Sequence, residues 1–218
     1  MLTPHLDKIN AAIVNPKAKN DVKVLTDGKK LYEKWIKDMD SLTSKGETRV
    51  KELVALLNQY KNQFEVELIM KQGTDFLRRQ KGQLKLDNSI MEEFLIHLIQ
   101  TKIILGLKNM ELVKGPQKAF MSLSFKPNNL NTLDDAPITN IKTKDQDFVV
   151  GTKIYYKFST NSNFTADKTT TGSFILPLLA SECKVNLDKT MYQEASGTSA
   201  RLKQGCPSAK YFLLVEYL

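Results

Sequence analysis

Two acids and a lysine at the ends of apolar segments are the residues of this chain best suited to chemistry. Glu182 and Lys184 close an apolar run that begins at Phe174, and an extended chain would place both side chains on one face, about 7 Å apart. Asp147 opens an earlier segment of strand-forming residues, and a hairpin can return the chain from there to Glu182. Burying such charges is costly unless a counter-ion accompanies them. The three residues therefore predict a site for a metal ion and an anion.

Hydrolysis of a phosphodiester is a reaction that such a set could catalyse. It needs a metal ion to polarise the phosphate and activate water, and a positive group to stabilise the charge that develops on the phosphoryl oxygens. Mg²⁺ is bound by a small number of carboxylates and keeps several waters, so two acids suffice. The alternative is a strand end with two solvated charges, Glu182 and Lys184, because Glu-x-Lys is common by chance. The upstream Asp147 favours the site.

The first half of the chain is predicted to be helical. Residues 26–107 carry apolar side chains at helical spacing, as in Leu31, Trp35, Ile36, Met39 and Leu42. Ser89 and Glu92 match a capping box, in which each side chain bonds to the other's backbone, so we expect a helix to begin there. His97 lies in that helix without a partner motif and is interpreted as a core residue.

A change of composition separates this helical part from a region rich in strand-forming residues. Pro, Asn and Asp accumulate at 115–139, including Pro127-Asn128-Asn129, which predicts a break in regular structure. Pro177 lies in an apolar strand and requires an edge position or a bulge. We therefore expect a helical subdomain at 1–115, a linker at 116–143 and a β-rich core at 144–218.

The core is predicted to contain three strands and one helix. These are a strand at 147–158, a polar hairpin loop at 159–171, a strand at 172–184, a helix at 187–204 and a strand at 211–218. Because the chain stops within the last of these, at Tyr217-Leu218, we interpret the product as short or truncated.

Charge and hydropathy narrow the class of partner and the compartment. The chain has 218 residues, 32 Lys and Arg against 24 Asp and Glu, and a net charge of +8, which favours a polyanionic partner such as nucleic acid or an acidic membrane surface. No apolar run reaches the roughly 18 to 20 residues of a bilayer span, and the N-terminus lacks a signal-peptide pattern. Cys183 and Cys206 have no metal or disulfide spacing. We expect a cytoplasmic protein without a membrane span.

The last third of the chain resembles a known family of nucleases. Asp145-Gln146-Asp147-Phe148, followed by a hairpin and then Ser181-Glu182-Cys183-Lys184, is similar to the metal-binding motif of PD-(D/E)xK nucleases. The segments 182–195 and 209–217 resemble the Bpu-type restriction endonucleases, which cut CCTNAGC-like sites. No Pro precedes Asp147, because Gln146 stands there, and Asp145 is the alternative ligand.

The resemblance implies a fold, a reaction and residue roles. It implies an α+β protein in which a helical N-terminal part precedes a mixed-sheet PD-(D/E)xK nuclease core of αβββαβ type. It implies a type II restriction endonuclease that hydrolyses DNA phosphodiesters with Mg²⁺, leaving a 5′-phosphate and a 3′-hydroxyl. Asp147 and Glu182 would bind the metal, and Lys184 would orient or activate the attacking water.

The same hypothesis predicts partners and secondary contacts. Double-strand cutting needs two active centres, so we expect double-stranded DNA as substrate and a homodimer or a heterodimer with a related subunit. Glu194 is a candidate additional ligand, and Asp188 is interpreted as a helix cap. Basic residues that could reach the DNA backbone are Lys153, Lys157, Lys168, Arg201 and Lys203, with Arg78, Arg79 and Lys81 as a further candidate group.

Two other interpretations remain open. In the first, the chain is a non-catalytic nucleic-acid-binding or assembly protein, and Glu182 and Lys184 form a surface ion pair that contributes roughly 0 to 1 kcal/mol. In the second, it is a repair or structure-specific nuclease that cuts without regard to sequence. Metal-dependent nicking of DNA separates the first from an enzyme, and a sequence preference separates the second from a restriction enzyme.

Overall fold

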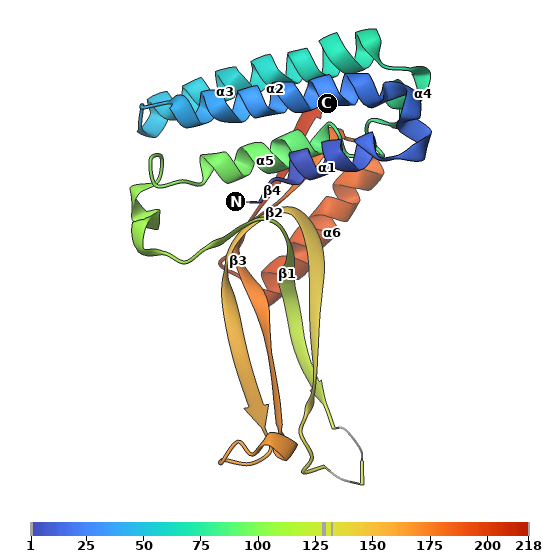
Figure 1. Cartoon of the computed structure of the whole chain (residues 1–218). Helices are drawn as coiled ribbons and strands as arrows, with labels where there is room; N and C mark the ends of the chain where they lie inside the picture. The colour runs from blue at the N-terminus through green and yellow to red at the C-terminus, as the bar shows by residue number, and fades with distance from the viewer. Residues whose placement is uncertain (1, 128–129, 132, 218) are drawn as a thin grey trace. The chain divides into compact units, whose positions relative to one another are not determined.

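The computed structural model describes residues 2–127, 130–131 and 133–217. The chain forms two compact units, Met1–Met110 and Glu111–Leu218. The first is helical, and the second is a four-stranded mixed sheet with one helix, which confirms the predicted α+β class with its helices first. Figure 1 shows the elements of each unit. In order they are α1 (Pro4–Ile13), η1 (Pro16–Asp21), α2 (Val22–Ser41), α3 (Gly46–Lys61), η2 (Asn62–Met70), α4 (Asp75–Gln80), α5 (Asn88–Leu98), η3 (Leu105–Asn109), β1 (Val113–Lys126), β2 (Ile138–Ser159), η4 (Ala166–Lys168), β3 (Thr169–Asn186), α6 (Lys189–Gly205) and β4 (Lys210–Tyr217).

The helical unit is held by apolar faces that meet in one core. Trp35 and Met39 of α2 and Leu53 of α3 are buried there, as their helical spacing predicts. The ring of Trp35 stacks on that of Tyr60 with centroids 4.6 Å apart. His97 is also buried, which confirms its interpretation as a core residue.

A buried polar cluster around His5 fastens α1 to its neighbours. The His5 ring nitrogens contact Ser89 Oγ at 2.8 Å and the Tyr60 hydroxyl at 2.7 Å. Glu93 accepts hydrogen bonds from the His5 backbone N–H and from the Tyr32 hydroxyl. The predicted capping box is therefore wrong, since the Ser89 hydroxyl is used in this cluster and the side chain of Asp87 caps α5 instead.

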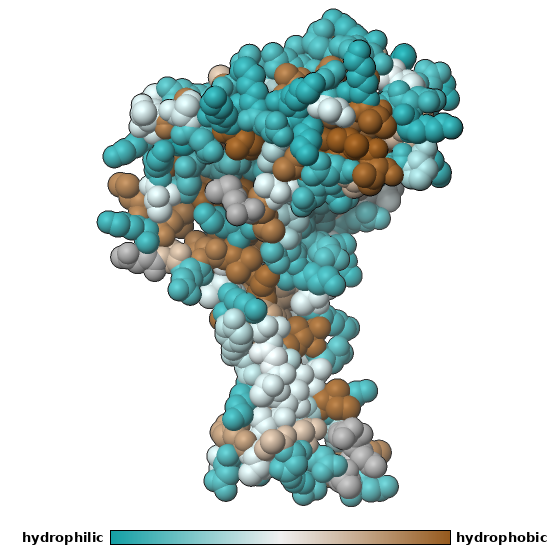
Figure 2. Space-filling view, viewed as in Figure 1, coloured by the Kyte–Doolittle hydropathy of each residue, from teal (hydrophilic) through white to brown (hydrophobic). Residues whose placement is uncertain are grey.

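The second unit is organised around the long strand β2. Its first part pairs antiparallel with β1 up to Gly151, and its last part pairs antiparallel with β3 from Phe148 onward. The two hairpins therefore run side by side, and they meet where Ala119 of β1 pairs with Ile175 of β3. β4 adds to the other side of β3 in parallel. Figure 2 shows hydrophobic side chains among hydrophilic ones on the visible face of these hairpins.

Register shifts bend this sheet, and two of them lie at prolines. Between Gly115 and Gln117 the register shifts, so that Asp147 and Phe148 together oppose Pro116. A second shift leaves Leu178 as the extra residue beside Pro177. A proline offers no N–H to a ladder, so bulges at both prolines are expected, and the one at Pro177 confirms a prediction from the sequence.

Helix α6 covers one face of the sheet. Its side chains Leu202 and, just beyond its end, Cys206 pack in one core with Ala119, Val149 and Ala180. Asp188 accepts a 2.7 Å hydrogen bond from the Met191 N–H at the start of the helix, which confirms its role as the cap.

The region expected to be irregular is mostly strand. The sequence predicts a break at 115–139 and a strand beginning at Asp147, whereas β1 extends to Lys126 and β2 begins at Ile138. The reason is that pairing in the β1–β2 hairpin tolerates Pro116 at a bulge, which composition alone does not reveal. Asn128 and Asn129, which form part of the predicted linker, lie outside the described residues, as does Leu218 at the end of the last predicted strand.

Among the described residues, no helix combines the length and apolar character that crossing a bilayer requires.

Candidate active site

Asp147 lies in the bend of β2, where the strand passes from pairing with β1 to pairing with β3. The bulge at this position interrupts the alternation of side chains and so changes the direction in which Asp147 projects. Its Oδ2 accepts a hydrogen bond from the Cys183 backbone N–H at 2.9 Å. The carboxylate is therefore directed toward β3, at the residue that follows Glu182.

Glu182 and Lys184 lie near the end of β3, two residues apart. Alternation along the strand places them on the same face, and Glu182 Oε2 lies 3.5 Å from Lys184 Nζ. Glu182 is 8% exposed, whereas the Lys184 side chain keeps 27% of its surface accessible. A nearly buried carboxylate is thus paired with a lysine whose side chain is partly accessible.

Tyr211 at the start of β4 adjoins both acids. Burial raises the pKa of the Tyr211 phenol most strongly, followed by a hydrogen-bonding contact with Glu182 and by the charges of Glu182 and Asp147. Within the described part of the chain, the phenol oxygen is buried and has no hydrogen bond of good geometry. The raised pKa keeps the phenol protonated, so it is a buried hydrogen-bond donor without a well-formed acceptor. Sequence reasoning did not assign it a role, because an apolar strand gives no sign of which aromatic residue faces an acid.

Carboxylates such as those of Asp147 and Glu182 are among the ligands that Mg²⁺ uses in proteins. Within residues 2–127, 130–131 and 133–217, no group of three or more His, Cys, Asp or Glu side chains is arranged to hold a metal ion. A closed protein cage of the kind that holds structural zinc is therefore not formed by the described residues. The donor set formed by Asp147 and Glu182 fits an ion that retains several water molecules.

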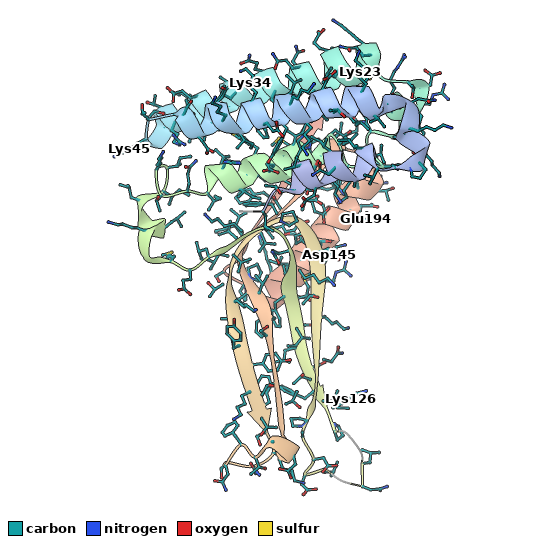
Figure 3. All side chains as sticks on the ribbon, viewed as in Figure 1. Lys23, Lys34, Lys45, Lys126, Asp145 and Glu194 are labelled. Atoms are coloured by element: carbon teal, nitrogen blue, oxygen red, sulfur yellow. The ribbon has the colours of Figure 1, made fainter. Side chains whose placement is uncertain are left out.

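The other acids considered from the sequence lie apart from this group. Asp145 is exposed and pairs in register with Lys118, and Glu194 is exposed on α6. Figure 3 labels both residues. The residues of α6 that face the sheet are instead Ala195, Thr198 and Leu202.

The predicted basic contacts divide into two kinds. Lys168 forms ion pairs with Asp134 at 2.9 Å and Asp135 at 3.3 Å, which ties the hairpin loops together and occupies its charge. Lys153 and Lys157 are exposed, and each lies over a neighbouring aromatic ring.

The two basic residues predicted on α6 are exposed, whereas the basic group of the helical unit is partly engaged. Arg201 and Lys203 are both accessible. Lys81 approaches Glu65 at 3.5 Å, and the Nε of Arg78 donates to the Gly73 carbonyl.

The fold of this chain is similar to that of a chain in a solved assembly. A solved structure described as the native BbvCI A2B2 tetramer at low resolution matches it with a TM-score of 0.68 and 18% sequence identity, covering 99% of this chain and 75% of that one. At that identity the likeness establishes the fold. No curated protein matches the chain.

A comparison of the sequence with known families identifies the family of this chain. The family described as Bpu10I restriction endonuclease matches residues 83–218, which is more than half of the chain. The chain therefore belongs to the Bpu10I restriction endonuclease family, and the resemblance drawn from its last third is confirmed and extends into the helical unit. Membership places it among endonucleases that act on DNA.

Proposed function

We propose that this chain is a subunit of a type II restriction endonuclease that hydrolyses double-stranded DNA at a specific site with Mg²⁺. The observation that carries the proposal is the bulge at Asp147. It directs one carboxylate to the backbone N–H of Cys183, the residue between Glu182 and Lys184 on β3, and those two side chains form an ion pair, which supports a shared site. The relevant alternative, a non-catalytic DNA-binding protein, gives no reason for burying Glu182.

Each residue has a distinct task in this proposal. Asp147 and Glu182 would hold the ion, which when bound polarises the phosphate and lowers the pKa of a bound water. Lys184, whose side chain is partly accessible, would orient the attacking water and stabilise negative charge on the phosphoryl oxygens. Tyr211 would fix the orientation of Glu182 by donating a hydrogen bond. Hydrolysis would leave a 5′-phosphate and a 3′-hydroxyl.

We also propose that the active form contains a second catalytic subunit. One centre of this kind cuts one strand, so a double-strand break needs either two copies of this chain or this chain with a related one. The BbvCI structure is described as an A2B2 tetramer, which supports assembly of this kind.

The test separates catalysis from binding. Lys184→Ala should abolish cleavage of a plasmid in Mg²⁺, while binding of a duplex in EDTA persists. Lys189→Ala removes the same charge at an exposed position five residues further on and should keep full activity. Full cleavage by Lys184→Ala would remove Lys184 from the mechanism. Binding by the wild-type protein that is never followed by nicking in Mg²⁺ would favour the non-catalytic alternative.

A further inference from the structure

A basic hollow lies between the β1–β2 hairpin and the last turns of α6. Its volume is about 670 Å³. Lys142 and Lys144 of β2 and Arg201 of α6 contribute its charges, together with the Gln204 amide. Its apolar lining comes from Phe120, Met121 and Leu123 of β1.

The backbone shapes this basic hollow. β1 has a register shift between Phe120 and Ser122 that makes Met121 an extra residue. Gly205 at the end of α6 lies so close to this bulge that an added Cβ would stand 1.9 Å from the Met121 carbonyl oxygen. Only glycine permits this approach, so the end of the helix and the bulge together form a fixed wall.

The basic hollow has three cations without a carboxylate partner in the described part of the chain. Across the residues that the structure describes, none of Lys142, Lys144 and Arg201 forms an ion pair with a carboxylate. Lys142 and Lys144 are two residues apart on β2 and share a face. Asp145, which lies between Lys144 and the bulge at Asp147, projects from the opposite face. The C-terminal end of α6 carries partial negative charge, so the side chains alone must attract an anion.

We infer that the basic hollow binds phosphates of the duplex DNA backbone beside the bond to be cut. The inference rests on the proposed function, because it takes DNA as the source of the phosphate. Lys144 precedes Asp147 by three residues, at most about 10 Å of extended chain. Since phosphates along one DNA strand advance about 3.4 Å each along the helix axis, Lys144 and Lys142 lie within a few nucleotides of Asp147. Arg201 and the Gln204 amide can donate to the same phosphates.

Salt dependence of binding tests this inference without requiring cleavage. The full-length protein is titrated with a 40-base-pair duplex in EDTA at several salt concentrations. Each lost phosphate contact lowers the slope of log K against log salt by about 0.9. The combined variant Lys142→Gln, Lys144→Gln, Arg201→Gln should therefore lower the slope by about 2 to 3. The matched control Lys23→Gln, Lys37→Gln, Lys45→Gln removes the same charge at exposed positions and should change it by less than about 1.

Every outcome decides the question. Equal changes in both variants would show an effect of net charge alone and overturn the inference. An unchanged slope in the combined variant would overturn the inference. If light scattering also shows a loss of oligomer mass, the basic hollow instead binds carboxylates of another subunit. If the wild-type protein shows the expected slopes but never nicks DNA in Mg²⁺, the proposed nuclease activity fails while phosphate binding stands. If the wild-type protein does not bind the duplex, both fail.

Discussion

The chain contains two buried polar clusters, and they differ in how completely their groups are paired. Around His5 in the helical unit, both ring nitrogens and both carboxylate oxygens of Glu93 have partners within the unit. Around Glu182 in the sheet unit, one ammonium group faces the carboxylate, and the nearby phenol of Tyr211 has a poorly formed contact.

This difference separates stability from function. A fully hydrogen-bonded cluster with no solvent access gains nothing from a ligand and specifies how helices pack. A cluster that collects negative charge and keeps one cation accessible has a reason to bind a further ion. We therefore expect substitutions in the first cluster to change the free energy of unfolding, and those in the second to change cleavage.

Glu182→Gln should produce the largest effect, and it should fall on chemistry. The amide has nearly the same shape but cannot neutralise a divalent ion, so we expect the cleavage rate to fall roughly 1,000-fold or more. The free energy of unfolding measured in urea should change by less than about 1 kcal/mol, because Lys184 can turn to solvent. Retained cleavage, or a loss of stability large enough to explain the lost activity, would contradict the assignment.

His5→Ala should produce the next largest effect, and it should fall on stability. The change leaves a cavity and deprives Tyr60 and Ser89 of partners, so the free energy of unfolding should drop by about 3 kcal/mol. Cleavage per folded molecule should stay unchanged at a temperature where the variant is folded. Tyr60→Phe, which removes one hydroxyl, should cost about 1 kcal/mol and serves as the graded control.

The same histidine predicts how stability depends on pH. Burial, and then the charge of Lys61, lowers the pKa of His5 from 6.5 to about 3. The unfolded chain therefore binds a proton below pH 6.5 that the folded chain refuses, so His5 makes the free energy of unfolding fall as pH decreases, by at most about 1.4 kcal/mol per pH unit.

Two neighbours modify this slope. Burial also lowers the pKa of His97, which adds to it. Burial raises the pKa of Glu93, which opposes it at the acidic end. Urea titrations from pH 7 to about 5 should show the fall, and His5→Ala should make it shallower. Identical slopes for both proteins would mean that His5 is protonated in the folded state.

Tyr211→Phe should have a much smaller effect on cleavage than Glu182→Gln. In the proposed ion-bound site the phenol would donate to Glu182, so its removal should lower cleavage about 10-fold at limiting Mg²⁺, with partial recovery at high Mg²⁺. The free energy of unfolding should stay within about 1 kcal/mol of the wild-type value, since the phenol has no hydrogen bond of good geometry to lose. A loss that Mg²⁺ does not restore would place Tyr211 outside the ion's surroundings.

The hydrophobic periodicity and the residues at the ends of elements predicted most of the helices and strands correctly. The helical spacing in α2 and α3, the cap at Asp188 and the bulge at Pro177 are local features, and all are present in the structure. The strand β1 was not predicted, because its residues pair with positions from 12 (Lys126 with Ile138) to 38 (Val113 with Gly151) further along the chain and its composition is typical of a loop.

The candidate site shows the same division. Glu182 and Lys184 are two residues apart on one strand, so their proximity follows from local geometry alone. The approach of Asp147 depends on a bulge opposite Pro116, and that of Tyr211 depends on the register of β3 with β4. Likewise, nothing in the sequence around His5 indicates that Ser89 and Glu93 contact it from α5.

Digestion of supercoiled plasmid by the wild-type chain and by Asp147→Ala, each with Mg²⁺ and with EDTA, tests the central claim most directly. Nicked and linear plasmid are both counted as cut, because one centre cuts one strand and two centres cut both. We predict nicks only for the wild-type chain with Mg²⁺. Equal nicking by Asp147→Ala, or nicking that persists in EDTA, would contradict the account.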